Sequence, residues 1–151
     1  MVQVFSMTRI LTIIAILFAT PAWAEETKSV KTAKLSKNIH ATFECIFLHA
    51  EAFERNEENS KMVGAAMERA MKQGHQFFEA LKSNEIKRED LRAHVPMYWF
   101  GVFSRMPTDF QLGQIFESSF DKSKELGDYF SWKQNAQRIY QEKNCDLILS
   151  R

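Results

Sequence analysis

The stretch that decides the fold is NIHATFECIFLHAEAF, residues 38–53. Its main apolar residues recur at spacings of 4, 3, 4 and 3, a pattern that one face of an α-helix produces and an extended strand does not. They are Ile39, Phe43, Ile46, Ala50 and Phe53. Cys45 lies in the middle of the same stretch. The pattern therefore predicts a helix that buries one stripe and carries a cysteine near that stripe.

A second helical stripe follows a short charged break. The break is ERNEENS, residues 54–60, and Ser60 is the N-cap that we expect for the second helix. The second stripe consists of Val63, Met67, Ala70, Gly74, Phe77 and Leu81. Because each stripe needs a partner, the two predict an antiparallel helical hairpin. Gly74 and Gly113 fall on inward stripes, where glycine costs about 1 kcal/mol relative to alanine, so we expect close helix crossings there.

The remainder of the chain predicts shorter helices. Pro96 and Pro107 bracket a short helix over 96–105, because proline suits the first turn of a helix and disrupts its interior. A longer helix is expected from 107, with Phe110, Gly113, Phe116, Phe120, Gly127 and Phe130 on one side. A last helix begins near Ser131, whose Gln134 completes a capping box, and reaches Cys145. Since no segment alternates with period two, the predicted fold is all-α, a bundle of four to five helices.

The first 24 residues have the layout of a secretory signal peptide. Arg9 precedes an apolar run over 10–19, and Ala22-Trp23-Ala24 provides small residues for a cut after Ala24. The run is shorter than the roughly 20 apolar residues that a membrane anchor needs. We therefore expect a soluble periplasmic protein with no stable membrane anchor. Its lysine-rich segment 25–37 is predicted to be a flexible tail, followed by a single domain over 38–151.

The chain has two cysteines, Cys45 and Cys145, and both lie in the part expected to be exported. An even number of cysteines in an oxidising compartment predicts a disulfide. It would close a loop of about 100 residues, worth roughly 4–5 kcal/mol in the chain-entropy description. The alternatives are two free thiols or a metal site built on Cys45 and His49. Zinc sites use three or four protein ligands, so we favour the disulfide, which would join the first and last core helices.

The segment VPMYWFGVFSRMPTDF, residues 95–110, concentrates aromatic side chains. On a helix over 96–105 we expect Trp99 and Phe103 in the core, with Met97, Tyr98 and Phe100 pointing elsewhere. A helix that is apolar on all sides is either central in the core or meets a second surface. Both interpretations stay open. In the second, Met97, Tyr98 and Phe100 form a patch that binds a partner.

Motifs of known catalytic chemistry are missing from this sequence. It has no His-Glu-x-x-His zinc motif, no Gly-x-Ser-x-Gly elbow, no Cys-x-x-Cys-His haem site and no phosphate-cradling glycine loop. His40 with Glu44 and His75 with Glu79 are i, i+4 pairs that predict surface contacts. After removal of Arg9 the charges balance, which argues against a nucleic-acid partner. We expect neither enzymatic activity nor a cofactor nor a bound metal.

The order of motifs resembles that of a class of small exported helical proteins of Gram-negative bacteria. Cys45 comes early and Cys145 late, with a Pro-x-Asp-Phe-x-x-Gly segment over 107–113 between them. The resemblance covers most of 43–145 and implies a helical fold and a periplasmic location, and it carries over no catalytic residue. In size, export and disulfide the chain also looks like periplasmic immunity proteins, which neutralise secreted toxins.

Three functions follow from these features. The first is a non-enzymatic helical module that binds another envelope or secreted protein, as an inhibitor or immunity factor. The second is a binder of a small apolar ligand inside the bundle, because methionine and phenylalanine fill irregular space adaptably. The expected lining is Met67, Met71, Phe77, Phe103 and Phe116. The third is a stress chaperone that loosens to expose its aromatic residues.

Overall fold

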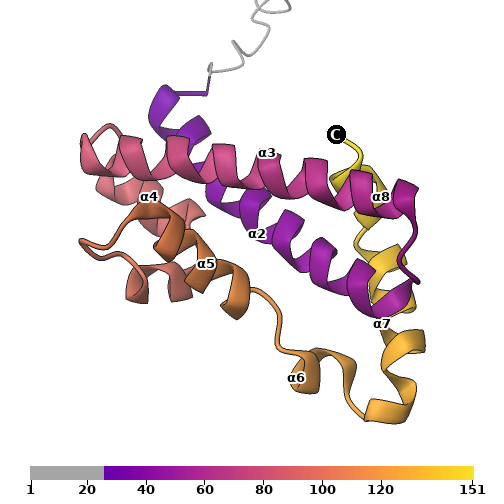
Figure 1. Cartoon of the computed structure of the whole chain (residues 1–151). Helices are drawn as coiled ribbons and strands as arrows, with labels where there is room; N and C mark the ends of the chain where they lie inside the picture. Colours follow the sequence, from indigo (N-terminus) through magenta and orange to yellow (C-terminus); the bar gives the residue numbers. More distant parts are fainter. Residues whose placement is uncertain (1–25) are drawn as a thin grey trace, which may run out of the picture.

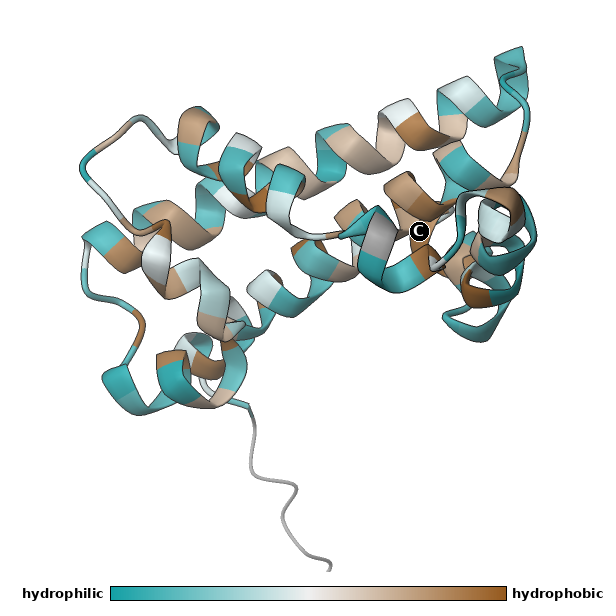
Figure 2. Ribbon diagram, turned by 90° about the horizontal axis from the view of Figure 1, so that it is seen from below, coloured by the Kyte–Doolittle hydropathy of each residue, from teal (hydrophilic) through white to brown (hydrophobic). Residues whose placement is uncertain are grey.

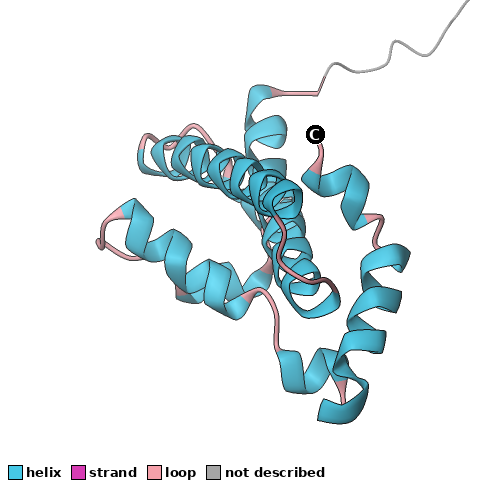
Figure 3. Ribbon diagram, turned by 45° about the vertical axis from the view of Figure 1, so that its right-hand side comes forward, coloured by secondary structure: helices cyan, strands magenta, loops and turns pink. Residues whose placement is uncertain are grey.

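The computed structural model describes residues 26–151, and all regular elements in that range are helical (Figure 3). In chain order they are α2 (Lys28–Ala52), α3 (Glu57–Lys82), α4 (Arg88–His94), η2 (Met97–Gly101), α5 (Thr108–Ser118), α6 (Lys122–Leu126), η3 (Tyr129–Ser131), α7 (Trp132–Glu142) and α8 (Cys145–Leu149), where η denotes a 3₁₀ helix. The all-α prediction is confirmed, although this part of the chain has seven α-helices rather than four or five. The predicted signal peptide lies outside the described residues.

The two longest helices, α2 and α3, form the antiparallel hairpin that their stripes predict (Figure 1). The turn between them places the N-cap one helical turn earlier than expected. Asn56, rather than Ser60, caps α3, and its side-chain oxygen accepts a hydrogen bond of 2.8 Å from the backbone N–H of Asn59. Glu57 and Glu58 occupy the first turn, where negative charge favours the helix dipole. Figure 2 shows hydrophobic and hydrophilic residues on the same helices, as amphipathic packing requires.

The N-terminal turns of α2 correct the prediction of a flexible tail. Residues 28–37 are helical, and Ala33 and Ser36 are fully buried. Ser29 is also buried and accepts a hydrogen bond of 2.8 Å from the N–H of Lys87, just before α4. The hydroxyl of Ser36 lies 3.3 Å from the carbonyl oxygen of His94, at the end of α4. Small residues at helical spacing let α4 pack closely on α2 and hold this segment in the fold.

The segment after α5 corrects the prediction of one long helix from 107 to 130. Ser118 ends α5, and Asp121 starts a new helix by accepting a hydrogen bond of 3.2 Å from the N–H of Lys124. Gly127, with φ of +71°, ends α6 in a conformation that favours glycine. The predicted apolar stripe is also wrong at both ends, because Phe110 is 52% and Phe130 93% exposed. On α5 the buried side carries Leu112 and Ile115 instead.

The C-terminal helices close the fold against α2. Ser131 precedes α7 as predicted, but its hydroxyl donates to the carbonyl of Asp128, so the expected capping box does not form. Asn144, with φ of +54°, separates α7 from α8. The predicted disulfide between Cys45 and Cys145 is confirmed, with their Cα atoms 5.4 Å apart. It therefore links α2 to α8, the first and last helices of the described chain. Within residues 26–151, no helix combines the length and apolar character needed to cross a bilayer.

Gly74 lies where α3 crosses α5, as the stripe predicts. A Cβ atom at this position would lie 2.6 Å from Cδ1 of Leu112 and closer still to Cδ2. Leu112 is fully buried, so its side chain has little room to move away. The same prediction for Gly113 is wrong, because Gly113 is exposed and a Cβ there would meet no atom within 4 Å.

Two alanine substitutions on α3 test this crossing. Gly74→Ala is expected to lower the free energy of unfolding by about 1–3 kcal/mol, because overpacking against Leu112 outweighs the gain in helix propensity. Gly64→Ala, on the same helix but with no atom within 4 Å of the added Cβ, is expected to raise it by about 0.5–1 kcal/mol. Urea unfolding measures both. If the two variants are equally stabilised, α3 and α5 do not pack as closely as described.

Candidate functional site

The short helix predicted after Pro96 is the 3₁₀ helix η2, and it ends at Gly101 rather than continuing to Arg105. A 3₁₀ helix has three residues per turn, so residues i and i+3 project from the same side. Met97 and Phe100 therefore share one side, and they are 87% and 41% exposed. Two neighbouring large apolar side chains thus face the solvent from one turn.

Trp99 projects from the other side of η2 and is fully buried, as predicted. Its ring meets Phe77 edge-on, with centroids 5.3 Å apart, and stacks parallel to Phe78 at 6.4 Å. Phe103, also predicted to be core, is half-buried and contacts the same two phenylalanines. The short helix η2 therefore inserts Trp99 into the core and leaves Met97 and Phe100 exposed. Binding of a partner by the exposed residues stays a prediction.

Tyr98 fastens η2 to α2 instead of facing a partner. It is half-buried, and its hydroxyl oxygen lies 2.8 Å from Nδ1 of His40. Burial lowers the pKa of His40 and raises the pKa of Tyr98. Both groups are therefore neutral near pH 7, and the tyrosine hydroxyl can donate to the imidazole nitrogen. The nearby indole N–H of Trp99 lowers the pKa of Tyr98 in part, without forming a hydrogen bond of good geometry.

The two predicted i, i+4 pairs, His40 with Glu44 and His75 with Glu79, do not form hydrogen bonds or ion pairs in residues 26–151. Glu44 pairs with Lys143 at 2.8 Å, which leaves His40 to Tyr98. His75 contacts Asp109 of α5 at 2.7 Å rather than the neighbouring Glu79. The hydrogen bonds of both histidines therefore go to other segments of the chain, while Glu44 still acts on His40 through its charge and partly raises the pKa of that imidazole.

A hollow of about 350 Å³ continues the exposed apolar side of η2 towards α3. The rings of Phe100 and Phe103 are in contact, with centroids 5.5 Å apart, which joins the hollow to η2. Phe78, Leu81, Phe103, Arg105 and Gln111 are among the residues that line it. We call Met97, Phe100 and this hollow the η2 surface. It combines two protruding apolar side chains with an adjacent depression.

Gln111 shapes the hollow, and sequence reasoning did not identify it. This glutamine of α5 is buried, and its amide donates to the carbonyl of Met106 at 2.7 Å. Its side-chain oxygen accepts from the N–H of Ser104 at 3.3 Å. Two hydrogen bonds thus hold the loop after η2 against α5. The sequence offered no signal for it, because the expected stripe placed Phe110 and Gly113 on the inward side, and both are exposed.

Three of the five residues expected to line a ligand cavity take part in ring–ring packing. Phe77 packs against Trp99, and Phe103 contacts Phe77 at 6.0 Å. Phe116 stacks on Phe47 at 4.5 Å and meets Phe43 edge-on at 5.1 Å. Each of these three phenylalanines therefore packs against other aromatic rings where a ligand was expected. Binding of an apolar ligand stays a prediction.

Residues 26–151 form a disulfide-linked, all-α fold with two exposed apolar side chains on a 3₁₀ turn. Cys45 is bonded to Cys145, which removes the alternative of a metal held by Cys45 and His49. Residues 26–151 contain no group of three or more histidine, cysteine, aspartate or glutamate side chains placed to hold a metal. Comparisons with protein-family models, with curated proteins and with solved structures give no match for this chain.

Proposed function

We propose that this protein is an exported helical module of the periplasm that binds another protein through the η2 surface, as an inhibitor or immunity factor. The observation that carries the proposal is the exposure of Met97 and Phe100 on a turn whose opposite side is anchored to the rest of the protein. Trp99 anchors that turn in the core, and Tyr98 ties it to His40. Apolar side chains fixed in advance lose little conformational entropy on binding, which favours their use as interface anchors.

The surroundings of the η2 surface also suit a protein partner. Arg105 lies at the rim of the hollow, and Lys82 lies on its α3 side. Protein interfaces commonly place an apolar centre inside a polar rim, with arginine enriched among the contacting residues. The hollow can receive a side chain of the partner while Met97 and Phe100 enter depressions on the partner. This complementary geometry supports a specific complex rather than nonspecific hydrophobic association.

Export is supported by two independent features. The first 24 residues have the charge, apolar run and small residues of a cleavable signal peptide. A disulfide joins the only two cysteines of the chain, and such bonds persist in oxidising compartments such as the periplasm. A protein in that compartment meets secreted toxins and envelope enzymes, which are the partners that we propose.

A double substitution tests the η2 surface. Met97→Ser/Phe100→Ser is expected to abolish capture of the partner from periplasmic extract and to weaken the purified complex by at least about 30-fold, the loss typical of one interface hot spot. The melting temperature should stay close to that of the wild type, because both side chains are exposed. Affinity capture with mass spectrometry identifies the partner, and calorimetry measures its affinity.

The matched control is Tyr129→Ser/Phe130→Ser, which removes two exposed aromatic side chains from η3. This variant should retain the partner with unchanged affinity. Loss of the partner in the control, or its retention by Met97→Ser/Phe100→Ser, would place the contact elsewhere. Native mass spectrometry of protein purified from its host addresses the alternative function, because a reproducible additional mass would favour a small bound ligand.

A further inference from the structure

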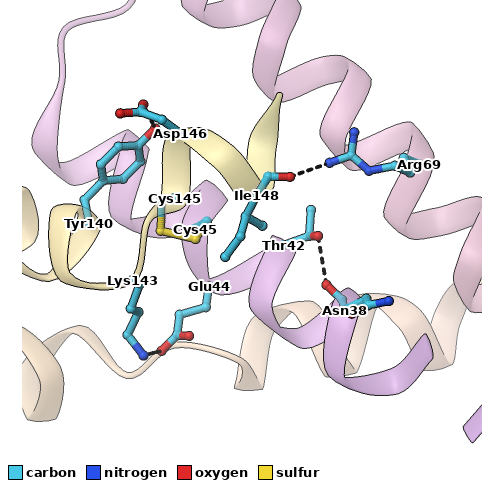
Figure 4. Close-up of a disulfide and its surroundings, with 10 residues drawn as sticks. All are labelled: Asn38, Thr42, Glu44, Cys45, Arg69, Tyr140, Lys143, Cys145, Asp146 and Ile148. Carbon is cyan, nitrogen blue, oxygen red and sulfur yellow. Dashed lines mark hydrogen bonds and ion pairs between the residues drawn. A yellow bond between two sulfur atoms is a disulfide. The ribbon is translucent and has the colours of Figure 1, made fainter. Parts of the chain in front are cut away.

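A basic pocket lies where α2, α3 and the C-terminal residues meet, beside the disulfide. Its volume is about 510 Å³, and none of the residues of the η2 surface lines it. The lining comes from three parts of the chain: Lys37, Asn38, Ala41 and Thr42 of α2, Arg69 and Gln73 of α3, and Lys143, Asn144, Leu147, Ile148 and Arg151 near the end of the described residues. Figure 4 shows Arg69 reaching from α3 towards Ile148 of α8, near Thr42 and Asn38 of α2.

The pocket carries positive charge that its own lining does not neutralise. Four cations line it, Lys37, Arg69, Lys143 and Arg151, and no aspartate or glutamate does. Lys143 pairs with Glu44 at 2.8 Å. Lys37 and Arg151 have no carboxylate partner among residues 26–151. Like charges gathered in one concave site attract a ligand of opposite charge.

Arg69 is held in place by two main-chain oxygens. Its guanidinium donates to the carbonyl oxygens of Ile148 and Arg151, at 2.8 Å each. Both acceptors are main-chain oxygens, and a guanidinium has five N–H groups, so further donors remain for a ligand. The two contacts fix the direction of the side chain. A guanidinium fixed in this way can bind two oxygens of one anionic group.

The charged and apolar parts of the lining together indicate the class of ligand. Lys37, Arg69 and Arg151 supply three positive charges that no side-chain carboxylate offsets, which matches a doubly charged anion better than a single carboxylate. Leu147, which is 57% exposed, and Ile148 add an apolar wall beside these charges. We propose that the basic pocket binds a phosphate group attached to an apolar group. This site is additional to the η2 surface, and its failure would leave the proposal for that surface intact.

Hexyl phosphate is the probe for a free organic phosphate, and vesicles with phosphatidic acid, which is also a phosphate monoester, are the probe for a lipid headgroup. The full chain should bind at least one of them saturably at low salt, and it should bind neither hexanol nor vesicles of phosphatidylcholine alone. Lys37→Gln/Arg151→Gln should weaken that binding at least about tenfold, because each charge-assisted hydrogen bond contributes roughly 1.5–3 kcal/mol. Isothermal titration measures hexyl phosphate, and co-sedimentation measures the vesicles.

The matched control is Lys72→Gln/Arg92→Gln, which removes one lysine and one arginine that are exposed and lie outside the pocket. It should bind like the wild type. Loss confined to Lys37→Gln/Arg151→Gln supports the pocket, and the probe that shows this loss identifies the source of the phosphate. Equal loss in both variants, or no saturable binding of either probe, overturns the proposal. Unfolding temperatures of both variants should match the wild type, since all four side chains lie at the surface.

Discussion

Replacing Cys45 and Cys145 together with alanine is expected to lower the free energy of unfolding by roughly 4–5 kcal/mol. The bond joins residues that are 100 positions apart in the sequence. Without it, the unfolded chain regains the freedom of a loop of that size, while the folded state keeps its other contacts. Both cysteines are buried, so small apolar alanines add little further cost. A loss of this size corresponds to a fall in melting temperature of roughly 15 °C for a domain of this length.

Circular dichroism during heating, with and without a reducing agent, measures the effect and supplies the control. The reducing agent should lower the melting temperature of the wild type towards that of the alanine variant. It should leave the variant itself unchanged. If reduction has no effect on the wild type and the variant melts at the same temperature, the disulfide does not stabilise the fold.

The disulfide matters most for α8, which cannot be stable by itself. This helix has five residues, far fewer than an isolated helix needs in water. It is held by the bond through Cys145, by the hydrogen bond of 2.7 Å from Tyr140 to Asp146, and by Arg69 (Figure 4). Since Arg69 and α8 both line the basic pocket, the same bond that closes the fold also shapes that pocket.

The sequence was most informative where apolar residues recur over several turns. The stripes over 39–53 and 63–81 predicted the hairpin, because burying a continuous apolar face leaves few alternatives. The segment 28–37 was missed for the opposite reason. Its buried residues, such as Ser29, Ala33 and Ser36, are small, and small residues carry little hydrophobic signal. Their burial depends on α4, whose position no local pattern reveals.

The candidate site was predictable in composition but not in geometry. An excess of apolar residues near 97–100 pointed to a second surface, and the structure exposes Met97 and Phe100 there. The sequence also placed Tyr98 in that patch, and its contact with His40 could not be foreseen because His40 lies 58 residues earlier in the chain. The aromatic residues after 107 were misleading, since periodicity alone suggested one long helix. A local capping aspartate and a glycine end such a helix even when the apolar spacing continues.

Trp99→Ala is expected to cost about 3–5 kcal/mol of unfolding free energy, the largest effect of any single substitution considered. The indole is fully buried against Phe77 and Phe78, and alanine would leave a cavity that these rings fill only in part. Trp132→Ala is the matched control. Trp132 is half-buried at the start of α7 and contacts Tyr129, so its loss should cost less than half as much. Urea unfolding compares the two variants.

The effect of Trp99→Ala on partner binding distinguishes the residue that anchors η2, Trp99, from the residues that we propose to contact the partner, Met97 and Phe100. Met97 and Phe100 remain in this variant, but η2 is no longer held from the core side. Below its melting temperature the variant should therefore bind the partner more weakly than the wild type, and the amides of η2 should exchange faster with solvent. Trp99→Phe, which keeps a ring between Phe77 and Phe78, should recover most of both properties. A turn released from the core loses additional conformational entropy on binding, so its affinity for the partner should fall. Full affinity of Trp99→Ala would therefore show that the η2 surface does not depend on its anchor.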